Sequence, residues 1–186
     1  LLWSALMESN EPRVEIREYL NSDIKYLSEN LRDADVCEIK AALNLNSLDG
    51  LEMCVKDCDE LWVATIDSIP ACIFGIQSEK ITNQYKDPQD VYAGMIWAMG
   101  TDSLFKYPKT LTRTSRKIIK RWLEDHDVLY NYIWSKNELH KKWLKSLGFQ
   151  FLEDCRIVNE FNEVFEFFCK LAPIEIDDGE VGGGKD

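Results

Sequence analysis

Cysteine and histidine, the residue types that most often bind transition metals or act as nucleophiles, are sparsely placed in this chain. Six Cys are scattered without a CxxC pair, and only two His occur among the 186 residues. Cys54 and Cys58 are spaced i, i+4 and could bind a metal from one helix face, although a buried free Cys more often packs as a small hydrophobe. The sequence therefore predicts no metal site and a reducing, intracellular compartment.

A second candidate site lies where the aromatic stretch that starts at Tyr130 gives way to a helical pattern ending at Phe149. Asn137 follows the aromatic run and is suited to cap a helix by accepting a backbone N–H. Gly148 can take the left-handed conformation that ends a helix, and Phe149 can then pack back on Leu144. These residues alone indicate a strand, a capped helix and a glycine stop, which is a structural unit.

The composition is that of a folded protein, with 45% hydrophobic and 30% charged residues. A formal net charge of −11 argues against binding nucleic acid or anionic lipid over a broad surface. No apolar run approaches the roughly 20 residues of a membrane span, and "LLWSALM" lacks the basic flank of a signal peptide. The basic helix from Lys109 to Arg121 could bind an acidic partner or nucleic acid, but an exposed charged face is the simpler explanation.

The hydrophobic periods predict the order β, αα, βββ, α, β, α, ββ, an α+β fold built on a mixed sheet. We expect residues 1–13 to be an N-terminal extension, 14–171 a single domain, and 172–186, which are acidic and Gly-rich, a disordered tail. The pattern at 91–99 is apolar almost throughout, which predicts a central strand. Ser22 is the candidate cap of the first helix. The other expected strands are 14–20, 61–66, 71–76, 128–134 and a final pair around 159–162; the later helices are 47–56, 109–124 and 139–147, and 77–90 is a loop.

Asn137, followed eleven positions later by Gly148 and Phe149, resembles the C-terminal half of the GNAT superfamily of acetyltransferases, where an Asn, a short helix and Leu-Gly-Phe recur. The order of elements from Val14 to Leu171 is also similar, so the resemblance implies a GNAT-like fold. More narrowly, stretches such as "LWVATIDSIPACIFGI" and "NELHKKWLKSLGF" resemble the GNAT-like internal virion protein A family of short-tailed phages.

The resemblance implies acetyl-CoA as a possible cofactor. GNAT enzymes hold its pyrophosphate on backbone N–H groups of a glycine-rich loop at a helix N-terminus, between the fourth strand and the next helix. Here that place is filled by "GTDSLFKYPKTLTR", residues 100–113, whose single Gly stands at the start, and Pro108 removes one donor. The candidate cofactor contacts are Asn137, Lys109, Thr110, Thr112 and Arg113.

The residues for acid catalysis depart from the same family. Many active members carry a Tyr seven residues after the Asn, and this position is Leu144. The neighbouring Trp143 has no readily lost proton and cannot replace a general acid, whereas Tyr130 or Tyr132 on the adjacent strand could.

No general base is assigned, and the catalytic residues stay unknown. Glu60 or Asp102 could deprotonate an amine substrate, although each is better explained as a surface charge or a cap. His140 is expected to face solvent in the first turn of its helix.

Two main hypotheses follow from the resemblance. In the first, the chain is a GNAT-fold phage protein with degenerate or lost acetyl transfer and a structural or assembly role; its partners are other phage virion or host proteins, and its location is the virion or the host cytoplasm. In the second, it is an active N-acetyltransferase that moves acetyl from acetyl-CoA to an amine.

Overall fold

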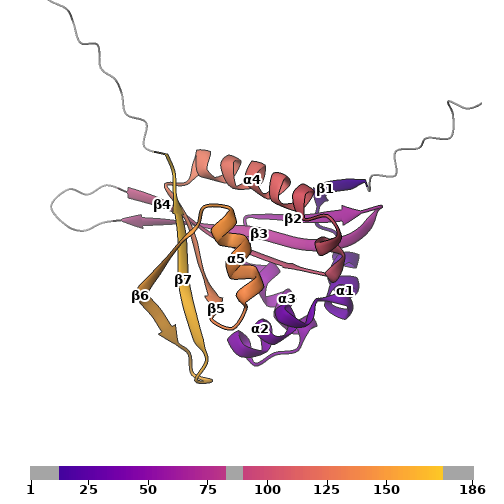
Figure 1. Ribbon diagram of the computed structural model, residues 1–186, viewed down its shortest axis with the longest axis horizontal. Helices are drawn as coiled ribbons and strands as arrows, with labels where there is room; N and C mark the ends of the chain where they lie inside the picture. Colours follow the sequence, from indigo (N-terminus) through magenta and orange to yellow (C-terminus); the bar gives the residue numbers. More distant parts are fainter. Residues whose placement is uncertain (1–12, 83–89, 174–186) are drawn as a thin grey trace, which may run out of the picture.

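A computed structural model describes residues 13–82 and 90–173 of the chain (Figure 1). The predicted extension 1–13 and tail 172–186 therefore lie almost entirely outside the described residues, as do positions 83–89 of the predicted loop.

The described residues form helices and strands in an order that matches the predicted one; the helix expected at 47–56 is present, and one short 3-10 helix is added. The strands are β1 (Val14–Glu18), β2 (Glu60–Ile66), β3 (Ile69–Thr82), β4 (Asp90–Gly100), β5 (Val128–Trp134), β6 (Gln150–Val158) and β7 (Val164–Leu171). The helices are α1 (Asn21–Asn30), α2 (Asp33–Leu43), α3 (Ser47–Lys56), α4 (Pro108–Asp125) and α5 (Glu138–Ser146), with a short 3-10 helix η1 (Asp102–Lys106) before α4. The fold class is α+β, as expected.

All seven strands join one sheet in the order β1-β2-β3-β4-β5-β7-β6. Only β4 and β5 run parallel, and β4 is central, which confirms the prediction from its apolar pattern. The expectation that residues 77–90 form a loop was wrong for 77–82. These residues extend β3, because they continue its antiparallel pairing with β4 as far as Thr82 opposite Asp90.

Each face of the sheet carries its own apolar core. Alternate residues of a strand point to opposite faces, so Phe74 packs with Trp122 of α4 and Leu144 of α5 on one face. Ile73 packs on the other face with Leu27 of α1 and Leu51 of α3. Figure 1 shows α4 and the α1 to α3 group on opposite sides of the sheet. The facing edges of β4 and β5 lie between these two helical layers.

The N-terminal cap was predicted wrongly for α1 and correctly for α5. Ser22 is not the cap of α1, which begins at Asn21; instead the Asp23 carboxylate accepts the Leu20 N–H at 2.8 Å. The reason is that Asp23 also binds Arg17, whose guanidinium fixes the carboxylate over the helix start. For α5 the predicted cap is confirmed, since the Asn137 side chain accepts the His140 N–H at 3.3 Å.

Gly148 has φ +85°, which confirms the left-handed stop predicted after α5. Replacing Gly148 by Ala is expected to lower the free energy of unfolding by about 1 kcal/mol, because a Cβ is disfavoured in this conformation. Gly148→Asn is the matched control and should cost less, since Asn tolerates left-handed backbone better. Chemical denaturation of both variants measures the difference; equal losses would show that the backbone conformation is not the cause.

Candidate functional site

The parallel pairing of β4 with β5 is short and ends at Met95 and Tyr130. The next ladder bond would run from the Tyr132 N–H to the Ile96 carbonyl. The Asn131 side chain takes its place: its amide nitrogen donates to Ile96 O at 2.7 Å, and its oxygen accepts the Tyr132 N–H at 2.7 Å. Asn131 thus holds the two strands apart from this point onward.

The edge of β4 beyond Asn131 faces an open gap. At Gly100 the backbone is already bonded, since its N–H donates to Asp35 Oδ2 at 2.8 Å and its carbonyl accepts the Arg32 N–H at 3.0 Å. Backbone groups of alternate residues point to the same side of a strand. The N–H and C=O of Ala98 therefore point into the gap, between Ile96 and Gly100.

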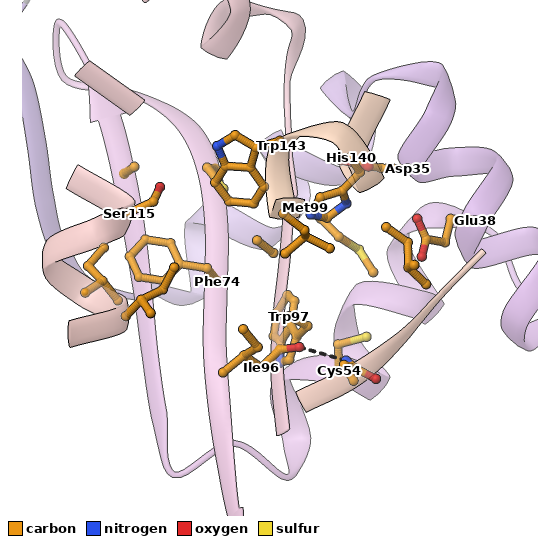
Figure 2. A pocket seen from close by; sticks show the side chains of 18 of the residues that line it. Asp35, Glu38, Cys54, Phe74, Ile96, Trp97, Met99, Ser115, His140 and Trp143 are labelled. Carbon is orange, nitrogen blue, oxygen red and sulfur yellow. Dashed lines mark hydrogen bonds between the residues drawn. The ribbon is translucent and has the colours of Figure 1, made fainter. Parts of the chain in front are cut away.

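The gap is part of a cavity of about 450 Å³. Its wall includes residues from both faces of the sheet, such as Phe74 and Ser115 on the α4 side and Cys54 on the α3 side (Figure 2). The cavity therefore passes between β4 and β5. Its lining is predominantly apolar and aromatic, with a few polar side chains, which is the usual character of a small-molecule site.

Three titratable side chains of the cavity wall lie together where α2 meets α5. Asp35 and Glu38 from α2 and His140 from α5 each offer a ligand-type atom, and these atoms all lie within 4.8 Å of one another. Burial raises the pKa of Glu38 to about 7, against the opposing effect of hydrogen bonds from Asn137 and Trp134. Burial also lowers the pKa of His140 to about 3, so the imidazole is neutral at physiological pH.

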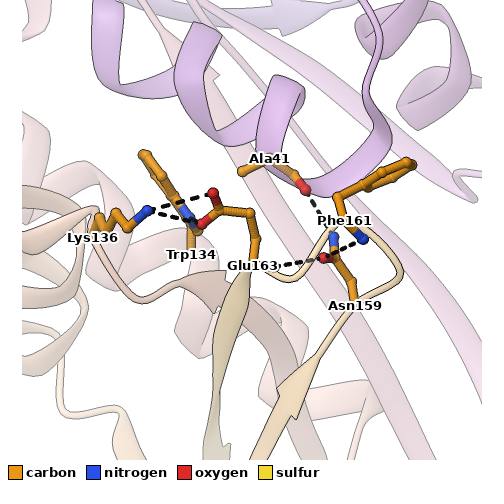
Figure 3. A network of polar contacts seen from close by, with 6 residues as sticks. All are labelled: Ala41, Trp134, Lys136, Asn159, Phe161 and Glu163. Atoms are coloured by element: carbon orange, nitrogen blue, oxygen red, sulfur yellow. Dashed lines mark hydrogen bonds and ion pairs between the residues drawn. The ribbon is translucent and has the colours of Figure 1, made fainter.

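Helix α2 spans the gap and is fastened to both of its edges. Asp35 binds β4 through the Gly100 N–H, and Glu38 binds the end of β5 by accepting the Trp134 N–H at 3.1 Å. At its far end α2 is tied to the β6–β7 turn, because Asn159 Nδ2 donates to the Ala41 carbonyl at 2.7 Å (Figure 3). These contacts fix the position of the carboxylates relative to the cavity.

The same turn is held to β5 by a small polar network. Glu163 accepts the Trp134 indole N–H at 2.8 Å and lies 3.0 Å from the Lys136 ammonium (Figure 3). Asn159 Oδ1 accepts the Phe161 and Glu163 N–H groups at 3.1 and 3.0 Å. The end of β5, which leads into α5, is therefore held both by Glu38 of α2 and by Glu163 of the β6–β7 turn.

The candidate cofactor contacts are not brought together. Asn137 is 3% exposed and its amide nitrogen donates to Glu38 Oε2 at 2.6 Å, while its oxygen caps α5. Lys109, Thr112 and Arg113 instead line a separate depression on the outside of α4 with Arg116 and Lys117, and Thr110 lines neither site. Leu111 and Thr114 are the residues that α4 turns toward the main cavity near its start.

The cavity wall lacks a proton donor at the position that the family comparison singled out. Leu144 is 3% exposed and lines the cavity. Tyr132 also lines it, whereas the Tyr130 hydroxyl donates to Glu79, and burial with this carboxylate raises the pKa of Tyr130 to about 12. Of the two tyrosines, only Tyr132 remains a candidate acid.

The candidate bases named from the sequence lie elsewhere. Glu60 accepts hydrogen bonds from the indoles of Trp62 and Trp122 and pairs with Arg121 at 2.7 Å, and Asp102 is an exposed residue of η1. Neither lines the cavity. The expectation that His140 faces solvent was wrong, because α5 turns it toward α2 and buries its Nδ1 atom.

The cysteine pair does line the cavity, and the Cys58 thiol is held by two hydrogen bonds. Cys58 Sγ donates to the Cys54 carbonyl at 3.2 Å and accepts the Trp97 indole N–H at 3.0 Å. Burial raises the pKa of Cys54 to about 11. Both residues therefore behave as small, partly apolar core side chains.

Sequence reasoning missed the α2 residues and Asn131. The i, i+3 spacing of Asp35 and Glu38 places both carboxylates on one helix face, and this was the available signal. Asn131 gives no local signal, since an Asn inside a strand has many possible partners.

The seven-stranded mixed sheet with its helices is a GNAT-like fold, which solved structures of several acetyltransferases share. The acetyltransferase of the GNAT family from Bacillus anthracis shares it with a TM-score of 0.59 at 12% identity, covering 86% of this chain and 95% of that one. Ribosomal-protein-alanine N-acetyltransferase from Brucella melitensis gives 0.58 at 13% identity, covering 84% and 99%. Aminoglycoside N(6′)acetyltransferase from Legionella pneumophila gives 0.55 at 16% identity, covering 87% and 92%.

At the sequence level the similarity is to a phage protein. Residues 91–155 match the family described as "Bacteriophage T7, probable scaffold protein Gp13". The "Probable scaffold protein gp13" of Escherichia phage T7 is 26% identical over 124 residues, which cover 64% of this chain and 74% of that protein. None of the helices in residues 13–82 and 90–173 is long and apolar enough to cross a membrane.

Proposed function

We propose that this chain is a GNAT-fold phage protein that has lost or weakened acetyl transfer and acts as a structural or assembly component. The similarity to the T7 scaffold protein supports the phage assignment. Its partners would then be other phage proteins or host proteins, met in the host cytoplasm during infection or in the virion.

The observation that carries this proposal is the connection from β4 to α4. Cofactor pyrophosphate would need free backbone N–H groups and close backbone approach at this point. Here Gly100 N–H is bonded to Asp35, and η1 turns Leu104 inward until it is 8% exposed. Helix α4 then starts with Pro108, which has no N–H to offer. The connection therefore packs Leu104 against the sheet instead of presenting free N–H groups to a ligand.

The alternative, an active N-acetyltransferase, is favoured by the cavity itself. The passage between β4 and β5 is present, and the Ala98 backbone groups face it. Glu38 lines the cavity with a pKa raised by burial to about 7, which suits a general base at neutral pH. Tyr132, which also lines the cavity, would be the candidate proton donor in that case.

Binding of acetyl-CoA separates these two functions. A ligand that binds only the folded state raises the melting temperature. We expect no measurable shift in melting temperature and no heat in calorimetry with millimolar acetyl-CoA. A clear shift that is lost in Ala98→Pro, which removes the N–H facing the gap, would contradict the proposal and support the enzyme. Thr110→Ala is the control, because Thr110 lines neither the cavity nor the depression on α4. Ala93→Pro would not serve, because Ala93 lies where β4 is paired with both neighbouring strands.

A further inference from the structure

The group formed by Asp35, Glu38 and His140 has the composition of a metal site. Two carboxylates come from successive turns of α2, and one imidazole comes from α5 (Figure 2). One ligand-type atom from each lies within 4.8 Å of the other two. Three protein ligands of N and O type with one position left open describe many zinc sites that bind a further small ligand.

Each carboxylate is already oriented by groups outside the cluster. Asp35 Oδ2 accepts the Gly100 N–H and lies 2.8 Å from Arg32 Nε. The two Glu38 oxygens accept the Trp134 N–H and the Asn137 amide. Such outer contacts hold metal ligands in place and leave further lone pairs on the carboxylate oxygens. The carboxylates are therefore held in place, and the three ligand atoms, which lie within 4.8 Å of one another, would move closer together around an ion.

The His140 imidazole supplies an independent indication. Its Nδ1 atom is buried, and within residues 13–82 and 90–173 it has no hydrogen-bond partner. Buried polar atoms almost always have one, and an absent ion is among the few physical explanations for an exception.

We propose that Asp35, Glu38 and His140 bind one divalent transition-metal ion of the zinc class. An imidazole with two carboxylates suits Zn²⁺ or Co²⁺ better than Mg²⁺, which prefers oxygen ligands alone. The remaining coordination position opens to the cavity, which all three residues line and which provides an entry path. This inference does not depend on acetyl transfer, so the site can exist in a protein without that activity.

The test is titration of the EDTA-dialysed protein with ZnCl₂ by calorimetry, and with CoCl₂ by visible absorption. We expect one equivalent of Zn²⁺ to bind and to raise the melting temperature, and Co²⁺ to give the absorption of a low-coordinate site, whereas MgCl₂ gives neither. His140→Ala should lose binding by at least tenfold in Kd. It should still fold, because Nδ1 gives up no hydrogen bond.

Two matched variants locate the ion. His126→Ala removes the other imidazole, whose nitrogens lie near the Trp122 carbonyl and the Ser78 hydroxyl, and should bind as the parent does. Cys54→Ser with Cys58→Ser should also retain binding, which excludes the thiols. The proposal would be overturned if the parent protein bound no Zn²⁺. It would also be overturned if His140→Ala and Glu38→Gln each still bound one equivalent of Zn²⁺ as the parent does.

Discussion

Replacing Asp35 by Ala is expected to lower the free energy of unfolding by about 3 to 5 kcal/mol, the range for breaking a buried ion pair. Asp35 is 2% exposed and joins Arg32 and the Gly100 N–H. Its removal leaves a guanidinium and a backbone donor without their acceptor, and it releases α2 from the edge of β4. Urea denaturation in the presence of EDTA measures the loss without any contribution from a bound metal.

Asp33→Ala is the control for this experiment. Asp33 also lies in the first turn of α2, but it is exposed. Its loss should cost less than about 1 kcal/mol, through the helix dipole alone. If the two variants lose equal stability, the buried bridge to Gly100 does not fasten α2 to the sheet.

Replacing Lys141 by Ala is the second change with a large expected effect, about 3 kcal/mol. Lys141 is 7% exposed, and its ammonium donates to the Ser135 carbonyl at 3.0 Å, to Glu138 at 2.9 Å and to Glu166 of β7 at 3.1 Å. Without it, the Ser135 carbonyl loses this donor, and Glu166 keeps only the more distant Arg156, at 3.6 Å. Thermal and urea denaturation should both report the loss.

Lys142 is the natural comparison, because it is the next residue of α5 and is exposed. Lys142→Ala should change stability by no more than about 0.5 kcal/mol. A loss for Lys141→Ala as small as that for Lys142→Ala would mean that the start of α5 is positioned by the Asn137 cap alone.

The order of elements could be read from the sequence because each has a clear period. The amphipathic stripe of α4 and the apolar run of β4 are long enough to identify, and Asn137 and Gly148 mark the ends of α5 chemically. The extension of β3 through Thr82 was missed because residues 77–82 are mostly exposed and polar. Their pairing with β4 is a property of the hairpin, which a local pattern does not contain.

The candidate site was harder to predict because it depends on contacts between residues far apart in the chain. Asp35 and Glu38 precede His140 by about a hundred positions, and only the packing of α2 across the β4–β5 gap brings them together. His140 was misplaced for the same reason: a first-turn position says which face of α5 it occupies, but not that α2 covers this face. Asn137 was placed correctly as a cap, while its bond to Glu38 was not foreseen.

The short β4–β5 ladder divides the sheet into two blocks, β1 to β4 and β5 with β7 and β6. Within each block the strands are paired along most of their length, whereas the blocks are paired only as far as Met95 and Tyr130. Beyond that point α2 bridges them, with Asp35 on one block and Glu38 on the other. Beyond the short ladder the two blocks are therefore joined by side-chain contacts, and an ion held by the two α2 carboxylates and by His140 would add a direct link between α2 and α5.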